Sequence, residues 1–243
     1  MKKKILLGAG IGLIVILVAV VLVVGFFLGD IIKAGMQTVG PKITQTSLTV
    51  DAVHVSVLTG AAGISGLVLG NPAGYKSASA ISVGKAAVSI APLSVMSDKI
   101  IIRSVEVLNP EITFEGNPFG ANNLKKIMDN VNAFTGPAAA AGTNAPAQAG
   151  GEKPAKKLEV DDFLITGAKV NFNGAVLPLP AIHLTDLGKG PEGITPAALI
   201  KEVLGQITTA TIKSVGASAA DAGKAIGNEA GKIGKSLGDL FKK

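Results

Sequence analysis

The sequence predicts a mainly β protein with additional α-helices: an N-terminal transmembrane helix, an antiparallel β-sheet with a short helix, and a C-terminal amphipathic helix. Three observations predict this fold class. A long uncharged run follows the first four residues, short β-branched runs separated by turn residues fill the middle, and apolar residues recur at helical spacing towards the C-terminus. The composition agrees, because 48% of the 243 residues are hydrophobic and only 16% are charged, which is typical of membrane-associated proteins.

Residues 1–35 are expected to form a signal anchor. Lys2–Lys4 precede an uncharged run whose apolar part, Ile5–Leu28, would be about 36 Å long as a helix and could cross a hydrocarbon core of ~30 Å. The apolar part of a cleaved signal peptide is shorter and ends in a small-x-small cleavage site, which this run lacks. The three lysines keep the N-terminus in the cytoplasm, so the rest of the chain should be exported.

Residues 43–188 are expected to form one β-domain. Apolar residues alternate from Leu48 to Val57, with a phase slip at Asp51–Ala52 that a β-bulge would explain. Later runs end at turn residues such as Asn71-Pro72 and Asn109-Pro110, and Asp161-Asp162 is interpreted as another turn. Asn122-Asn123 should cap a short helix whose apolar positions follow helical spacing: Leu124, Ile127, Met128 and Val131.

Residues 136–157 interrupt this domain. The segment consists mainly of Gly, Ala, Pro and Lys, and it cannot bury enough apolar surface to offset the entropy of ordering it, so we expect a flexible loop. The strand pattern resumes at Leu158. The segment Leu177–Leu184 predicts an edge strand or two, because its prolines remove ladder donors. One sheet interrupted by a loop is favoured over two domains.

Parts of the predicted β-domain resemble AsmA-like envelope proteins. The matching features are an Asn-Pro-x-Gly-aromatic turn at Asn71–Tyr75, a strand leading into Val105–Glu115, and an Asn-Leu helix start at Asn123-Leu124. The resemblance covers residues 43–131 and 157–188. It departs from the family pattern in two ways: Val105 stands where the family has Ile, and the chain is much shorter than the large members.

The resemblance implies an inner-membrane, single-pass protein whose periplasmic domain is a curved β-sheet. Its concave apolar face would hold lipid acyl chains during envelope lipid transport or outer-membrane upkeep. Val68 and Val88 are the expected lipid contacts in the strands. The strand residues themselves are compatible with two structures, an acyl-chain groove or an ordinary sandwich core. With a solid core, the domain would instead be a non-catalytic structural or scaffolding protein that binds envelope protein partners.

Residues 196–243 predict an amphipathic helix. Its apolar positions begin with Leu199, Ile200, Val203 and Leu204 and continue through Ile226, Ile233 and Leu237. Several glycines weaken the helix. Two interpretations remain open: the helix lies on the membrane or closes over the groove, with Ile226, Ile233 and Leu237 as contacts, or it is a loosely ordered soluble tail.

The remaining composition argues against several other functions. There are no cysteines and no tryptophans, and Arg103 is the one arginine, which argues against thiolate metal sites and against nucleic-acid binding. His54 and His183 are far apart in the sequence, and no nucleotide-binding or hydrolase motif is present. We therefore expect no enzyme activity, no cofactor and no metal, with membrane lipids as the main partners.

Overall fold

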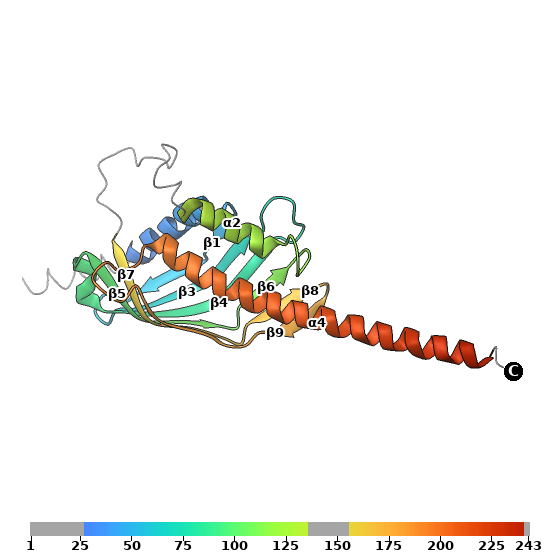
Figure 1. The fold of residues 1–243 in the computed structure, drawn as a ribbon. Coiled ribbons are helices and arrows are strands. Elements are labelled where there is room, and N and C mark those ends of the chain that lie inside the picture. The colour runs from blue at the N-terminus through green and yellow to red at the C-terminus, as the bar shows by residue number, and fades with distance from the viewer. Residues whose placement is uncertain (1–26, 136–155, 241–243) are drawn as a thin grey trace, which may run out of the picture.

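The computed structural model describes residues 27–135 and 156–240. They form a mixed α/β fold in which an open, curled β-sheet, close to half a barrel, carries three α-helices on its concave side (Figure 1). Of the predicted anchor, residues 1–35, the first 26 lie outside the described residues, and residues 27–35 belong to a helix that continues to residue 44. Among the helices of the described segments, none is both long and apolar enough to cross a membrane.

The sheet contains ten strands. They are β1 (Leu48–Thr49), β2 (Ala52–Val55), β3 (Ala61–Gly70), β4 (Ser79–Ile90), β5 (Lys99–Leu108), β6 (Glu111–Phe114), β7 (Lys157–Thr166), β8 (Lys169–Phe172), β9 (Ala175–Pro178) and β10 (Ile182–Leu187). The helices are an edge helix (residues 27–44), α2 (Asn123–Thr135) and α4 (Pro196–Leu240), and η1 (Pro92–Met96) is a short 3-10 helix. The strands on both sides of residues 136–155 belong to one sheet.

The sheet is mixed, so the prediction of an antiparallel sheet holds for most strand pairs but not for all of them. Strand β7 pairs in parallel with β5, and β8 pairs in parallel with β6, while the other pairs are antiparallel. Parallel neighbours need a long connection that returns the chain to its starting end. Helix α2 and the following residues 136–156 are that connection, and β7 begins at Lys157, one residue inside the predicted loop.

Six residues at strand breaks or irregular positions lie in one row across the sheet. The register of the flanking pairs places Asp51 opposite Gly66, and the row continues through Gly84, Asn109, Gly167 and Pro180. Three of these residues have positive φ angles: Gly66 (60°), Asn109 (50°) and Gly167 (66°). Irregular positions of this kind bend strands and increase their local twist.

Side chains change faces at this row. On β5 and β6 the residues that face the helices are Val105 and Val107 before the row, but Pro110 and Ile112 after it. The step across the row is therefore three residues, whereas alternation within a strand requires two. The phase slip predicted at Asp51–Ala52 is present. However, β1 and β2 pair with β3 in the same register, so no extra residue is inserted as it would be in a β-bulge. The slip is part of this row.

The glycines of this row should respond differently to substitution. In Gly66→Ala and Gly167→Ala the new Cβ would overlap the side chains of Asp51 and Asn109, and a positive φ would be forced on alanine. We expect each to lower the free energy of unfolding by about 1–3 kcal/mol. Gly84→Ala is the matched control, because its Cβ meets nothing within 4 Å, and it should be neutral or slightly stabilising. Thermal unfolding followed by circular dichroism tests this, and equal losses at all three glycines would contradict it.

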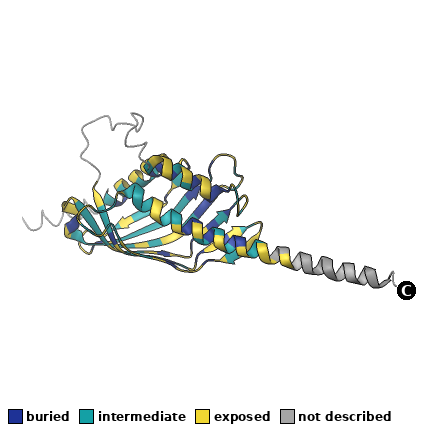
Figure 2. Ribbon diagram, viewed as in Figure 1, coloured by how far each residue is buried: buried dark blue, intermediate teal, exposed yellow. Residues whose placement is uncertain are grey.

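The core lies between the concave face and the helices (Figure 2). Leu124, Ile127 and Val131 of α2 are buried as predicted, and Asn122 caps this helix by accepting a hydrogen bond from the Lys125 N–H (2.9 Å). On the sheet, the rings of Phe114 and Phe172 pack edge to face with centroids 5.6 Å apart.

The edge helix covers one margin of the sheet. Lys33 Nζ donates to the Asp51 carbonyl (2.7 Å), and Gly29 and Gly40 allow the helix to approach Val53 and Leu48 closely. These contacts cover an edge strand that would otherwise be free to pair with other chains. At the opposite margin β9 and β10 form a strand interrupted by Pro180, as the edge-strand prediction required.

Candidate functional site

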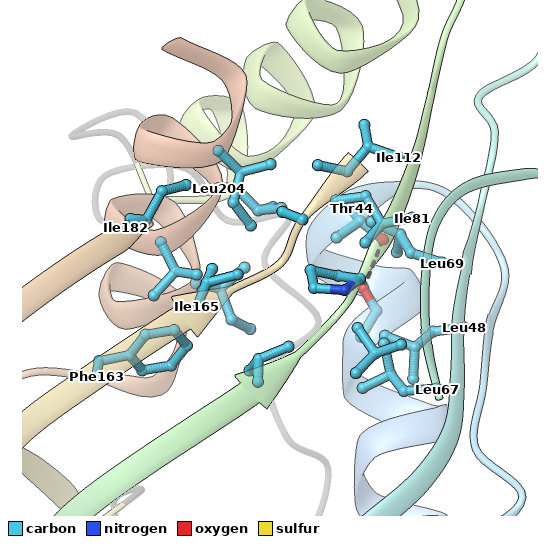
Figure 3. A pocket seen from close by; sticks show the side chains of 18 of the residues that line it. Thr44, Leu48, Leu67, Leu69, Ile81, Ile112, Phe163, Ile165, Ile182 and Leu204 are labelled. Atoms are coloured by element: carbon cyan, nitrogen blue, oxygen red, sulfur yellow. Dashed lines mark hydrogen bonds between the residues drawn. The ribbon is translucent and has the colours of Figure 1, made fainter. Parts of the chain in front are cut away.

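An apolar cavity of about 280 Å³ lies between the concave face of the sheet and the helices (Figure 3). Its wall comes from the edge helix, from seven strands and two of the breaks between them, and from the first turns of α4. The lining residues are Gly40, Thr44, Leu48, Leu67, Leu69, Ile81, Val83, Val107, Pro110, Ile112, Phe163, Ile165, Ala168, Ile182, Leu199, Ile200, Val203, Leu204 and Ile207. In Figure 3 the labelled side chains from the sheet, α4 and the edge helix converge on a common space.

The cavity offers no polar group to a ligand. Thr44 is the one lining residue with a polar side chain, and its hydroxyl is already hydrogen bonded to the Gly40 carbonyl (2.9 Å) and to Thr46 Oγ1 (3.0 Å). A polar or charged ligand placed here would lose its hydration without compensation. The lining therefore fits an apolar group better than a polar one.

The size of the cavity is sufficient for a ligand. An engineered apolar cavity of ~150 Å³ in another protein accepts benzene, and the present one is larger. Leu67, Val83 and Phe163 line it and are only half-buried, so accessible apolar surface remains within this space. Close packing would have removed that surface, as protein interiors contain few voids larger than a water molecule.

Helix α4 forms one wall of the cavity. Leu199, Ile200, Val203 and Leu204, which the sequence places on one face, all line it, together with Ile207 one turn later. The interpretation in which this segment closes over the sheet therefore describes the first turns of α4. Its later part extends past the sheet (Figure 1). Ile226, Ile233 and Leu237 lie on that part, and their side chains are outside the described residues.

The two strand residues expected to contact lipid lie outside the cavity lining. Val68 pairs with Ser82, between Leu67 and Leu69, which line the cavity, so its side chain points to the convex face. Val88 pairs with Val105, whose side chain packs against the core, so Val88 faces the helix side but beyond the row of irregular residues. On these two strands the cavity is lined instead by Leu67, which precedes Val68 on β3, and by Val83, which lies on the other side of the row from Val88 on β4.

The polar residues that carry the family resemblance form a network at the end of the sheet near the start of α2, whereas Val107, Pro110 and Ile112 of the same resemblance line the cavity. Asn123 is fully buried, donates to Asn71 Oδ1 (2.8 Å) and to the Thr113 carbonyl (2.7 Å), and accepts from the Glu115 N–H (3.0 Å). The Glu115 carboxylate accepts from the backbone N–H groups of Lys76 (2.8 Å) and Ser77 (2.6 Å). The network joins the 71–78 loop, β6 and α2, so its residues hold the scaffold and do not line the cavity.

Glu115 should make stability depend on pH. Hydrogen bonds from the Ser77 side chain and from the Lys76 and Ser77 backbone lower the pKa of the Glu115 carboxyl below its ordinary value of 4.5. A carboxylate with a lowered pKa stabilises the folded state above the ordinary value, and the contribution is lost as the pH falls through the folded-state pKa. At neutral pH we expect Glu115→Gln to lower the free energy of unfolding by about 1–3 kcal/mol.

The difference between wild type and Glu115→Gln should shrink as the pH falls below 4.5. Urea unfolding of both proteins across an acidic pH series measures it. Glu111→Gln is the matched control, since Glu111 is an exposed carboxylate of the neighbouring strand β6 and its loss should change stability by less than about 0.5 kcal/mol. A difference that stays constant at all pH values would contradict this assignment.

Asp161, Asp162 and His183 lie on two neighbouring strands of the sheet, β7 and β10. Asp161 and Asp162 lie within β7, so their interpretation as a turn is wrong, because the strand continues through them to pair with β5 and β10. Asp162 is paired with His183 of β10, and both side chains are about half exposed. Among residues 27–135 and 156–240, no three His, Asp or Glu side chains gather as a metal site would require.

The comparisons with protein-family models, with curated proteins and with solved structures find no match to this chain. The fold and the cavity therefore define the class on their own: an open half-barrel whose concave face and helices enclose an apolar cavity.

Proposed function

We propose that the protein is a membrane-anchored periplasmic protein that binds lipid acyl chains between the concave face of its sheet and α4. In this proposal residues 1–35 anchor it in the inner membrane with the N-terminus in the cytoplasm. Binding of hydrocarbon serves lipid transport within the envelope or the integrity of the outer membrane, and the protein is a binding protein, not an enzyme. The resemblance of residues 43–131 and 157–188 to AsmA-like proteins supports the same assignment.

The observation that carries the proposal is the cavity without a free polar group. A ligand held there gains free energy by removing apolar surface from water, at about 25 cal/mol per Å². Thr44 cannot orient a polar headgroup, because its hydroxyl is already paired within the edge helix and with Thr46. The headgroup of a bound lipid would therefore remain outside, and selectivity would depend on the chain more than on the headgroup.

The direct test is mass spectrometry of lipids that co-purify with the full-length protein extracted in mild detergent. We expect phospholipid that resists detergent exchange and is present in stoichiometric amount. Loosely associated annular lipid exchanges with detergent and provides the baseline. A protein that is folded by circular dichroism but holds no exchange-resistant lipid would contradict the proposal.

The alternative function is a scaffold whose β-domain binds envelope proteins. The observation in its favour is the outer margin formed by β9 and β10, which has no further strand partner within the described residues. Strand addition at such a margin is a common mode of peptide recognition. However, Pro178 and Pro180 lie in this margin and remove hydrogen-bond donors, which limits the length over which a partner strand could pair.

A further inference from the structure

Five exposed apolar side chains of the described residues gather at one end of the sheet, in the turn between β2 and β3 and in η1. We call them the apolar tip: Val57, Leu58, Leu93, Val95 and Met96. Phe119, which is 77% exposed, lies elsewhere, in the loop between β6 and α2. Leu58, Leu93 and Met96 are 77%, 85% and 89% exposed. Large apolar residues exposed together in this way indicate a surface that meets another apolar phase.

The two parts of the tip are held side by side. The Ile90 N–H donates to the Gly60 carbonyl (2.8 Å), which joins the β2–β3 turn to the end of β4 just before η1. Gly60 has a φ of 73°, and a Cβ there would lie 3.1 Å from Pro92 Cγ, so the turn and η1 are in close contact. The tip is therefore one built surface and not two independent loops.

The polarity of η1 is reversed relative to an ordinary surface turn. Its serine is inside: Ser94 is buried, its hydroxyl donates to the Ala91 carbonyl (2.6 Å), and its oxygen accepts from the Ile101 N–H (2.9 Å). Leu93 and Met96 are outside. An aqueous surface would favour the opposite arrangement, whereas hydrogen bonds satisfied internally and apolar side chains turned outward suit contact with hydrocarbon.

The chain enters the described fold at the same end. The first turns of the edge helix lie against the end of β2, where Gly29 is packed on Val53, and Phe27 and Ile31 are 57% and 66% exposed. The uncharged run Ile5–Leu28 leads directly into this helix. If that run crosses a bilayer, residue 27 lies at the membrane surface, and the apolar tip lies beside it.

We propose that the apolar tip contacts the phospholipid bilayer next to the N-terminal anchor, inserting Leu58, Leu93 and Met96 into the interfacial region. The sheet then stands on the membrane by two attachments, the anchor and the tip, so the domain has a defined orientation. This inference rests on the anchor of the proposed function, but it is independent of whether the cavity binds lipid.

The composition provides a clean test, because the chain contains no tryptophan and no cysteine. The full-length variants Leu93→Trp and Met96→Trp are reconstituted into vesicles of phosphatidylethanolamine and phosphatidylglycerol, with part of the lipid brominated on its acyl chains. We expect the tryptophan emission to shift to shorter wavelength and to lose most of its intensity, since bromine quenches only fluorophores at the depth of the acyl chains.

Val176→Trp is the matched control. Val176 is also exposed (61%), but it lies on β9 near the opposite end of the sheet, so its emission should stay at the wavelength of a hydrated indole and should not be quenched. Equal quenching at Leu93→Trp and Val176→Trp, or none at either, would overturn the proposal. Met96→Cys carrying an environment-sensitive fluorophore repeats the measurement if a tryptophan variant fails to fold.

The outcome also separates the two proposals. Quenching at the tip without exchange-resistant lipid in the purified protein would retain the membrane contact and reject the lipid cavity. Bound lipid without quenching would retain the cavity and reject the tip. A full-length chain that does not associate with vesicles would reject both the tip contact and the membrane anchor.

Discussion

Val203→Phe should abolish the co-purification of lipid while leaving the protein folded. Val203 lies on the wall that α4 contributes to the cavity, and a larger side chain there occupies space that hydrocarbon would otherwise fill. Without a ligand, filling an apolar cavity removes more surface from water, so we expect the free energy of unfolding to rise by about 0.5–2 kcal/mol. The lipid content is measured by mass spectrometry of the purified full-length protein.

The matched control for this variant is Val39→Phe. Val39 lies on the edge helix, is 46% exposed and does not line the cavity, so the same enlargement should leave the bound lipid unchanged. Retention of lipid by Val203→Phe would show that the ligand lies elsewhere and would reject the cavity. If Val203→Phe is more stable than the wild type and neither of these two proteins carries lipid, the cavity is an unfilled space in the core and the scaffold function is favoured.

A second substitution tests the site from the sheet side. Val83 of β4 also lines the cavity but approaches it from the concave face, so Val83→Phe should displace lipid as Val203→Phe does. Val68 offers a comparison on the neighbouring strand, because its side chain points to the convex face. If the concave side of the sheet binds the ligand, Val68→Phe retains lipid and Val83→Phe loses it.

Much of the fold could be predicted from local pattern. The helical spacing of Leu124, Ile127 and Val131 identified α2, and the turn residues Asn71-Pro72 and Asn109-Pro110 marked the strand ends correctly. The parallel pairing of β5 with β7 could not be predicted this way, because it depends on the path of the connection. A segment of Gly, Ala and Pro indicates flexibility but carries no information on which end of the sheet it returns to.

None of the residues expected to contact lipid is among those that line the cavity: Val68 and Val88 lie outside it, and the side chains of Ile226, Ile233 and Leu237 are not described. Helical periodicity placed Leu199, Ile200, Val203 and Leu204 on one apolar face, but it did not identify that face as the wall of a cavity. On the sheet, the row from Asp51 to Pro180 moves side chains to the other face at each crossing, so alternation within one segment does not predict the face of the next. The signal that could have found the cavity was the repeated glycine or Asn-Pro interruption in successive strands at a common register.

The largest loss of stability is expected for Asn123→Ala. The Asn123 side chain is buried completely and satisfies three partners, Asn71 Oδ1, the Thr113 carbonyl and the Glu115 N–H. Alanine would leave these groups without a partner in the interior, at about 1–3 kcal/mol for each unsatisfied group. Since effects within one network are not additive, we expect a total of about 3–5 kcal/mol, a large part of the stability of an ordinary domain.

Asn132→Ala is the control, because Asn132 is exposed on the same helix and alanine is the better helix former, so that variant should be neutral or slightly more stable. Urea unfolding followed by circular dichroism compares the two. A loss below about 1 kcal/mol for Asn123→Ala would mean that water replaces the missing amide, which requires the 71–78 loop to open. In that case α2 would be held on the sheet by the packing of Leu124 and Ile127 and not by the hydrogen-bond network.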